Sequence, residues 1–456
     1  MIDQNQNIQF KLNSELIDHV QGLIGIKDDQ GIKKLFNDFH YADIAEILNE
    51  LNFEESIYVI KLLDSKKTSD VLTEIDEDIR EKILDRLSNK EIAEEIEELD
   101  TDDATDIIAE LPVERQEDVI SKIEDEELKA EIKELLNYDE DSAGGLMAKE
   151  LVKVYETWTV GGCLRKIRAQ AENVTRVHSI YVVTKKEELI GRLSLKDLIT
   201  AKSDQKIADI YISNVDYANV NDDVEDVAKI MTKYDLEAIP VTDDNRILLG
   251  RITIDDIVDV IKEEADKDYQ LAAGIYQDVE ADDSVFELTK ARLPWLVLGL
   301  FGGLGSVFIM SGFDHIMESV PELFFYTPLI AAMAGNVGVQ SSAIIVQGLA
   351  NNNVKGSLFF RLLKEVGLSL INGFTLALLV ILFGYIINQE LVHSIAVAIS
   401  MMSVIIVAAL IGTFVPIILD KKGIDPAIAT GPFITTSNDI LGIYLFFIIS
   451  EFIIGF

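Results

Sequence analysis

Five long apolar segments occupy the last third of the chain, and they constrain its fold more than any other feature. A helix that crosses a lipid bilayer needs about 20 mostly apolar residues, because its length has to match the hydrocarbon core. Five segments meet this requirement and predict a transmembrane domain of five helices within residues 291–456. They are Leu293–Gly312, Leu323–Gln347, Leu363–Ile387, Leu391–Leu419 and Pro426–Phe456.

The part of the chain before these segments is strongly acidic. Residues 1–292 carry 35 Lys and Arg against 70 Asp and Glu, whereas residues 293–456 carry 5 against 9. This excess of negative charge repels phosphates and argues against nucleic acid as a partner. It leaves two interpretations open, a surface that only maintains solubility and a surface that binds cations. The one cysteine, Cys163, allows neither an internal disulfide framework nor a cysteine metal cage.

Basic residues near the apolar segments predict their orientation. Lysines and arginines lie before the first segment, between the second and third, and between the fourth and fifth, while the other joins and the tail have none. Short basic loops stay in the cytosol. We therefore expect a multi-pass protein of the plasma membrane, embedded in lipid, with cytosolic N-terminal domains and its C-terminus outside. The basic residues are Lys290, Arg292, Lys355, Arg361, Lys364, Lys421 and Lys422.

Aliphatic residues recur every 12 positions over about residues 30–136. Each is preceded by another aliphatic three positions earlier, and residues spaced i, i+3 share one face of a helix. Such short helices bury their apolar faces only by stacking. The pattern predicts an α-helical superhelix in residues 1–137. The repeating positions are Leu51, Leu63, Ile75, Leu87, Leu99, Leu111, Ile123 and Leu135.

A second repeat, about 59 residues long, predicts two α/β units at residues 138–203 and 204–262. Ile190–Ile199 (IGRLSLKDLI) recurs as Leu249–Val258 (LGRITIDDIV). The units resemble paired cystathionine-β-synthase (CBS) domains, in which a Ser/Thr-x-x-Asp pair often holds the ribose and phosphate of an adenine nucleotide. Such pairs also cap helices, so ATP binding and simple capping both stay open. The matching residues are Ser194, Asp197, Thr253 and Asp256.

A charged segment joins these units to the first apolar segment. It predicts a connecting (plug) helix at residues 263–290 that begins near residue 254. The pairs Asp255/Asp259 and Glu264/Asp268 are spaced i, i+4, and such acidic pairs destabilise a helix unless a cation neutralises them. The segment is either a cation-binding element or an ordinary solvated linker.

Polar residues within the apolar segments are candidates for contact with an ion. Asp439 lies inside the last segment, where an ionisable group is costly and usually functional, although it would also fit a buried polar network. Asn336 lies in the second segment. Asp425 lies at the cytosolic end of the last segment, where it either attracts cations or caps the helix. Oxygen ligands with one carboxylate suit Mg²⁺ and disfavour softer metals.

The order of these parts resembles the MgtE family of magnesium channels and transporters. The resemblance lies in Asp139–Met147 (DEDSAGGLM), the run PLIAAMAGNVGVQSS and Ile424–Gly442. It implies a homodimer with one pore, a Mg²⁺ site at Asp439 and Mg²⁺ bound between the cytosolic domains. Val339 and Gly431 depart from the family pattern. The implied sensor carboxylates are Asp70, Asp102, Asp106, Asp223, Glu225, Asp235, Asp256, Asp259, Glu264 and Asp268.

The expected function is therefore uptake of Mg²⁺, gated by cytosolic Mg²⁺. Two carboxylates about 4 Å apart repel by roughly 4 kcal/mol at an effective dielectric of 20, and a bridging cation removes that repulsion. The alternatives are a transporter of Co²⁺ or another divalent cation, and a nucleotide-sensing membrane receptor without transport. We expect no enzyme, because the sequence has no nucleophile–base constellation and no phosphate-binding glycine loop.

Overall fold

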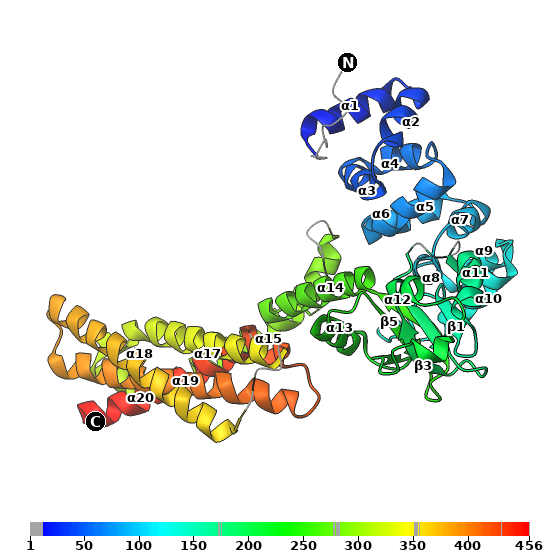
Figure 1. The fold of residues 1–456 in the computed structure, drawn as a ribbon. Helices are drawn as coiled ribbons and strands as arrows, with labels where there is room; N and C mark the ends of the chain where they lie inside the picture. Colours follow the sequence, from blue (N-terminus) through cyan, green and yellow to red (C-terminus); the bar gives the residue numbers. More distant parts are fainter. Residues whose placement is uncertain are drawn as a thin grey trace, which may run out of the picture. The chain divides into compact units, whose positions relative to one another are not determined.

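The computed structural model describes residues 12–455 except 172, 173, 175, 277, 278, 280–282, 351–353, 355 and 430. Lys355, one of the basic residues used above for orientation, lies outside the described residues. The chain forms two compact units, Met1–Ile261 and Lys262–Phe456. Figure 1 shows the elements in chain order, coloured from blue to red.

Short helices build the first part of the N-terminal unit. Alternate helices pack on one another, α3 with α5, α5 with α7 and α7 with α9 on one side, and α4 with α6 and α8 with α10 on the other. The helices are α1 (Ser14–Gly25), α2 (Asp29–Asn37), α3 (Tyr41–Glu50), α4 (Phe53–Ile60), α5 (Ser65–Glu74), α6 (Glu77–Arg86), α7 (Asn89–Ile96), α8 (Thr101–Ala109), α9 (Val113–Lys122) and α10 (Glu126–Leu135).

The 12-residue repeat forms the core of this superhelix, as predicted. Most of the repeating aliphatic residues are buried, including Ile75 and Leu111, while Leu63 and Leu99 are only partly buried against the core. Side chains start several of the helices. In α4, Asn52 and Glu55 form a capping box, in which each side chain accepts a hydrogen bond from the other residue's backbone N–H.

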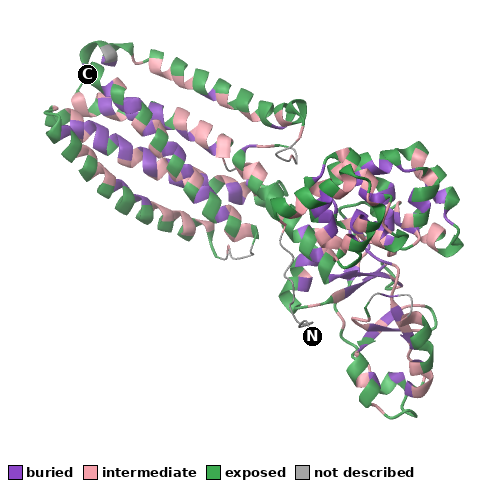
Figure 2. Ribbon diagram, turned by 90° about the horizontal axis from the view of Figure 1, so that it is seen from above, coloured by how far each residue is buried: buried purple, intermediate pink, exposed green. Residues whose placement is uncertain are grey.

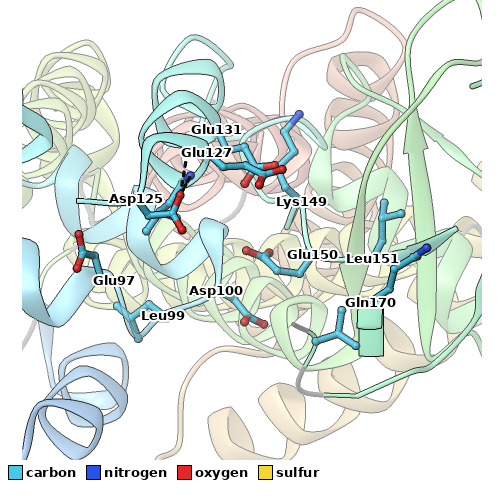
Figure 3. A pocket seen from close by; sticks show the side chains of 12 residues that line it. Glu97, Leu99, Asp100, Asp125, Glu127, Glu131, Lys149, Glu150, Leu151 and Gln170 are labelled. Carbon is cyan, nitrogen blue, oxygen red and sulfur yellow. Dashed lines mark hydrogen bonds between the residues drawn. The ribbon is translucent and has the colours of Figure 1, made fainter. Parts of the chain in front are cut away.

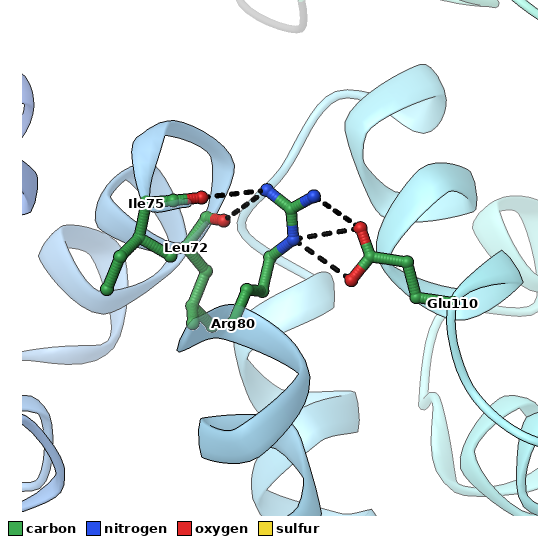
Figure 4. A network of polar contacts seen from close by, with 4 residues as sticks. All are labelled: Leu72, Ile75, Arg80 and Glu110. Atoms are coloured by element: carbon green, nitrogen blue, oxygen red, sulfur yellow. Dashed lines mark hydrogen bonds and ion pairs between the residues drawn. The ribbon is translucent and has the colours of Figure 1, made fainter. Parts of the chain in front are cut away.

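An arginine ties together three helices of the superhelix (Figure 4). Arg80 Nε donates to both carboxylate oxygens of Glu110, at 2.9 and 3.0 Å. Its Nη1 donates to the carbonyl oxygens of Leu72 and Ile75, at 3.3 and 3.2 Å. These carbonyls lie at the C-terminal end of α5 and have no partner within the helix. One guanidinium on α6 therefore closes the end of α5 and holds it against the end of α8.

Two small sheets follow, one for each predicted α/β unit. In each sheet the first strand pairs parallel and the third antiparallel with the central one. The strands are β1 (Val152–Tyr155), β2 (Ile180–Val183), β3 (Leu189–Leu193), β4 (Ala218–Asn219), β5 (Ala238–Thr242) and β6 (Leu248–Thr253), and the helices are α11 (Val160–Ala171), α12 (Leu195–Thr200), α13 (Val224–Tyr234) and α14 (Ile254–Ala273), with a 3₁₀ turn at Ile207–Asp209.

The segment before β1 packs on the second α/β unit rather than the first. Ala143 N–H donates to the carbonyl of Asp222 at 2.7 Å, and Ala148 and Arg251 exchange backbone hydrogen bonds at 2.8 and 2.9 Å. Ala143 and Met147 share a buried core with α13 and β5. The predicted domain boundary at residue 138 assigns this segment to the first α/β unit. In the structure the segment packs on the second unit before the chain enters the first.

The connecting helix is shorter than the predicted range 263–290. α14 ends at Ala273, and Gly274 follows with φ of +81°, a conformation that favours glycine at the end of a helix. α15 begins at Val285, eight residues before the predicted first span. The prediction counted only apolar residues, whereas a helix also tolerates the charged side chains that precede them. The predicted continuous helix is thus corrected to two helices.

Five helices of the second unit are long and apolar enough to cross a membrane, counted over the described residues. α19 is the most buried of them and α15 and α18 the least; Figure 2 colours the buried residues purple. The elements are α15 (Val285–Ser311), α16 (Asp314–Ser319), a 3₁₀ turn at Pro321–Tyr326, α17 (Thr327–Ala350), α18 (Leu358–Ile386), α19 (Leu391–Asp420), a 3₁₀ turn at Pro426–Ala429 and α20 (Gly431–Ile454).

Replacing Arg80 tests the tie between α5, α6 and α8. We expect Arg80→Met to lower the local unfolding free energy by about 2–3 kcal/mol, because hydrogen bonds to charged groups are lost. Hydrogen–deuterium exchange of the full protein measures this in the amides of α5 and α8. Arg86→Met is the control, since Arg86 pairs with Glu54 at 3.7 Å on the exposed surface and should cost less than about 1 kcal/mol. Equal exchange in both variants would contradict the assignment.

Candidate functional site

Asp439 on α20 lies at the wall of a cavity inside the membrane domain. The cavity has a volume of about 270 Å³ and is bounded by α17 and α20. Asn336 from α17 lines the same cavity, so the structure brings two of the predicted pore residues together. The other lining residues are Ala331, Ala332, Gly335, Val339, Gln340 and Thr435.

Glycines allow α17 to approach both α20 and α19 closely at this level. A Cβ atom on Gly335 would lie 3.5 Å from Asp439 Oδ1, and one on Gly338 would lie 1.8 Å from Asn438 Nδ2. A Cβ atom on Gly412 of α19 would lie 2.3 Å from the carbonyl oxygen of Gly338. That last contact is to backbone, so no rotamer change relieves it. Any side chain at Gly412 would force α17 and α19 apart.

Asn438 and Asp439 are adjacent in sequence and have different surroundings. Asn438 is 1% exposed, and its amide atoms have no hydrogen-bond partner among the described residues. It packs on the backbone of α17 and does not line the cavity. Asp439 is half-buried, and its Oδ1 atom is buried without a partner within the same described part of the chain. The polar network that would have explained Asp439 without an ion is therefore not seen there.

A second, larger cavity reaches Asp439 from the side of α15. Its volume is about 720 Å³. Apolar and small residues form most of its wall, and besides Asp439 its polar members are Arg292 and Trp295 from α15 and Thr435 and Thr436 from α20. The remaining lining residues are Ala273, Gly274, Ile275, Leu296, Gly299 and Pro432. The Asp439 side chain thus borders one cavity on the α17 side and another on the α15 side.

Asp425, the third predicted pore residue, acts in the structure as a cap. Its carboxylate accepts a hydrogen bond from Ala427 N–H at 2.7 Å, at the start of the turn before α20. The side chain is exposed, and the described lining of the two cavities does not include it. The structure therefore supports the capping interpretation of Asp425.

In the N-terminal unit, three of the predicted sensor carboxylates lie within electrostatic reach of one another. Burial raises the pKa of Asp102 on α8, and Asp256 at the start of α14 raises it further. Burial also raises the pKa of Asp106 to about 7, with Asp256 among the smaller causes. Asp103 lies between them, and its pKa is raised to about 7 by burial and by Asp256. The sequence did not single out Asp103.

The other predicted sensor residues are more dispersed. Burial raises the pKa of Asp70 on α5, and one helical turn later the pKa of Glu74 is raised by burial and by Asp259 of α14. Asp223 caps α13 by accepting from Glu225 N–H at 2.9 Å, Glu225 pairs with Lys229 at 3.0 Å, and Asp235 ends α13 in a left-handed conformation.

Glu264 and Asp268 lie on the part of α14 that belongs to the second unit. Lys267 donates to Glu264 at 3.1 Å. No group of three or more His, Cys, Asp or Glu residues has metal-holding geometry within the described ranges. The carboxylates are therefore gathered but not arranged as a finished metal site.

The candidate nucleotide residues cap helices. Ser194 Oγ accepts from Asp197 N–H at 3.0 Å and donates to the Asp197 carboxylate at 2.6 Å, at the start of α12. Thr253 donates to Asp256 through its backbone N–H at 2.9 Å and its hydroxyl at 2.8 Å. The capping interpretation holds for both pairs. Nucleotide binding stays a prediction for both pairs, because a helix cap neither requires nor excludes a nucleotide.

An acidic pocket lies between the superhelix and the first α/β unit, and it was not predicted from the sequence (Figure 3). Its volume is about 400 Å³. Glu150 accepts hydrogen bonds from Thr101 N–H at 3.1 Å and from its hydroxyl at 2.9 Å, and Lys149 pairs with Glu134 at 2.7 Å. The pocket was not foreseeable from spacing, since its walls come from distant segments. The acidic residues that line it are Glu97, Asp100, Asp125, Glu127, Glu131 and Glu150.

Comparison with known proteins places the chain in a family. Residues 327–449 match the MgtE profile described as divalent cation transporter, residues 39–141 match the MgtE intracellular N domain, and residues 143–204 and 207–263 match the CBS domain. The chain is 36% identical over 314 residues to the magnesium transporter MgtE of Bacillus subtilis (strain 168). The aligned region covers 69% of this chain and 70% of that protein. The chain belongs to the MgtE family.

Two further relatives agree with this assignment. The magnesium transporter MgtE of Thermus thermophilus is 35% identical over 323 residues, 70% of this chain and 72% of that protein. A crystal structure described as the cytosolic domain of the Mg²⁺ channel MgtE in complex with ATP is similar at a TM-score of 0.51 and 33% identity. It covers 54% of this chain and 99% of that chain. The predicted MgtE resemblance and fold class, a helical N-domain with tandem CBS domains and five membrane helices, are confirmed.

The raised pKa values predict how pH acts on the N-terminal unit of this MgtE protein. A carboxyl group with a raised folded pKa binds its proton more tightly in the folded state, so stability is gained as pH falls through that value. Without divalent cations, we expect the melting temperature to rise by a few degrees between about pH 8 and about pH 5, at about 2–4 °C per kcal/mol. Thermal unfolding of the detergent-solubilised protein measures this.

The variant Asp103→Asn/Asp106→Asn is the matched comparison, since it removes the two groups whose pKa is about 7. Its melting temperature should depend less on pH over the same range. Added Mg²⁺ should stabilise the unchanged protein more at the higher pH, because protons compete with the cation for carboxylates. A pH dependence that is the same in both proteins would refute this interpretation of the cluster.

Proposed function

We propose that this MgtE protein is a Mg²⁺-selective channel or transporter for magnesium uptake. One observation carries the proposal: Asp439 and Asn336, from two membrane-spanning helices, line one cavity. A carboxylate with amide and hydroxyl oxygens around it is the ligand set that a hard cation prefers. Relatives at 35–37% identity are named magnesium transporters.

The size of the cavity supports passage of a partly hydrated ion. Its volume is about 270 Å³, and a water molecule takes about 30 Å³ in the liquid. The cavity therefore has room for a Mg²⁺ ion with several of its waters. Mg²⁺ gives up its waters reluctantly and commonly binds through one or two carboxylates. Asp439 would hold the ion directly or through a water, with Asn336 and Gln340 orienting the remaining waters.

We further propose that cytosolic Mg²⁺ regulates this uptake through the carboxylates of the N-terminal unit. Asp102, Asp106 and Asp256 lie within electrostatic reach of one another, and burial already disfavours their charged forms. A divalent cation among them would replace the bound protons and favour the compact arrangement. A ligand that binds one arrangement better shifts the population toward it. The connecting helix α14, which carries Asp256, would transmit this shift toward the membrane.

The remaining parts of the proposal concern assembly and topology. We propose a homodimer in the plasma membrane, with cytosolic N-terminal domains, the C-terminus outside and ATP as a regulatory ligand of the CBS pair. The ATP proposal is supported by the similar cytosolic domain solved with ATP. The proposed domains are residues 1–137, 138–203, 204–262 and 291–456, with residues 263–290 as the segment that connects the CBS pair to the membrane domain.

A preference for Co²⁺ and a receptor without transport are the competing functions. The cavity lining offers oxygen donors and no His or Cys, which disfavours a softer metal. A receptor anchor has no need for a carboxylate within a membrane helix, where it is costly. Both alternatives are separated from the proposal by flux measurements.

Asp439→Asn should lower Mg²⁺ flux into proteoliposomes by at least about tenfold, because the amide has lost the charge that attracts the cation. A fluorescent Mg²⁺ indicator inside the vesicles reports the rate. Glu451→Gln is the control, since Glu451 pairs with His315 at 3.1 Å at the other end of α20 and should leave the flux near that of the unchanged protein. Full flux through Asp439→Asn would show that the pore assignment is wrong, and faster Co²⁺ flux would favour the competing ion.

Regulation by cytosolic Mg²⁺ predicts that variants of the N-terminal carboxylates lose sensitivity to inhibition by Mg²⁺. In vesicles with the N-terminal unit exposed to buffered Mg²⁺, high Mg²⁺ on that side should slow the flux and protect α14 from protease. Asp102→Asn/Asp256→Asn should shift the inhibitory Mg²⁺ concentration upward by about tenfold. Asp118→Asn is the matched control, because Asp118 pairs with Lys122 on an exposed helix face. Equal inhibition and equal cleavage in all three proteins would exclude this sensor.

A further inference from the structure

Trp295 and Asp439 line the same cavity of the membrane domain, and each has a buried polar atom without a partner among the described residues. Trp295 on α15 and Asp439 on α20 both line the cavity of about 720 Å³. The indole Nε1 of Trp295 is buried and has no hydrogen-bond acceptor among the described residues. Asp439 Oδ1 is also buried and has no hydrogen-bond donor among them. Buried polar groups are almost always hydrogen-bonded, and leaving one unpaired costs free energy. Two such groups beside one cavity point to each other as partners.

The chemistry of the lining restricts the choice of acceptor. An indole N–H only donates, so Arg292, which also only donates, is excluded. The side-chain acceptors in the lining are the hydroxyls of Thr435 and Thr436 and the carboxylate of Asp439. Thr435 Oγ1 donates to the carbonyl of Gly431 at 2.9 Å and keeps its lone pairs, so both hydroxyls are available as neutral acceptors. The carboxylate is the stronger acceptor, because a bond to a charged oxygen is about twice as strong as a neutral one.

The packing of α15 on α20 makes this pairing attainable. A Cβ atom on Gly302 would lie 1.9 Å from Thr436 Cγ2, so the two helices are in close contact about two turns from Trp295. At Gly299, which also lines the cavity, a Cβ atom would meet nothing within 4 Å. This open position lies about one turn along α15 from Trp295, on the cavity that Trp295 and Asp439 both line.

We propose that Trp295 is a positioning residue for Asp439. Its indole N–H donates to Asp439 Oδ1 when the carboxylate turns toward α15, and this holds the carboxylate away from the cavity on the α17 side. A Mg²⁺ ion in the α17-side cavity competes for the same carboxylate. The position of Asp439 therefore alternates between the indole and the ion, and the indole weakens ion binding enough to permit release. This inference rests on the proposed function of Asp439 as the ion-binding residue.

The two tryptophans of the chain allow a direct spectroscopic test. Trp158 lies in the first CBS unit against Tyr155 and Lys166. Trp158→Phe leaves Trp295 as the sole indole, whose emission reports the loss of its hydrogen bond. In the full-length Trp158→Phe protein, Mg²⁺ should shift the emission of Trp295. The half-maximal shift should occur at the Mg²⁺ concentration that gives half-maximal flux. The same titration in Trp158→Phe/Asp439→Asn should give no shift, because the charged acceptor is gone.

Flux measurements provide a second test of the role of Trp295. Trp295→Phe keeps a ring and removes the N–H, and we expect the half-saturating Mg²⁺ concentration to fall about tenfold, the effect of one charge-assisted hydrogen bond. Maximal flux should not rise. Phe308→Leu, on an exposed face of α15, is the control and should leave both values unchanged.

The outcomes separate this inference from the pore assignment. Unchanged half-saturation in Trp295→Phe, no emission shift with Mg²⁺, or a shift that persists in Asp439→Asn would each overturn the role of Trp295. If Trp295→Phe does not fold, the emission titration with Asp439→Asn still decides. Undiminished flux through Asp439→Asn would instead overturn the assignment of Asp439 itself.

Discussion

A carboxylate inside a membrane domain is costly unless it has polar contacts or water, and the packing around Asp439 leaves two cavities beside it. Gly335 leaves space beside its Oδ1 atom, while Gly338 and Gly412 bring α17 against α20 and α19. Close backbone approach is how membrane helices associate when no hydrophobic force distinguishes neighbour from lipid. The glycines therefore do two things at once, since they hold the helices together and leave the cavities that Asp439 borders.

The N-terminal unit faces the same cost in a different setting. Asp102, Asp103 and Asp106 share the short helix α8, and Asp256 comes from a helix more than a hundred residues later. Burial raises their pKa values, and neighbouring carboxylates raise them further. A cluster of this kind is stable when protonated or when it binds a cation, and neutral pH favours the cation. Both halves of the molecule thus place carboxylates in surroundings that disfavour their charge, where a divalent cation would remove that penalty.

Periodic features were predictable from the sequence and contacts between distant segments were not. The 12-residue repeat located the buried stripe of the superhelix, although Leu63 and Leu99 are less buried than the spacing implies. Apolar length located the five membrane helices but placed the start of α15 too late. Asp439 stood out because of its charge within an apolar segment. Trp295 did not, since a tryptophan there looks like an ordinary membrane anchor until its unpaired N–H is found on a cavity that Asp439 also lines.

Val339 shows how one wall residue bears on the ion within this cavity. It lines the α17-side cavity with Asn336 and Gln340, and its side chain offers no oxygen to a cation. An apolar wall cannot replace a water of hydration, so an ion held by Asp439, as proposed, would keep its water on that side. Mg²⁺ holds its waters more firmly than larger divalent ions do. The departure at Val339 therefore favours recognition of the hydrated ion by the carboxylate and the two amides over direct coordination by the cavity wall.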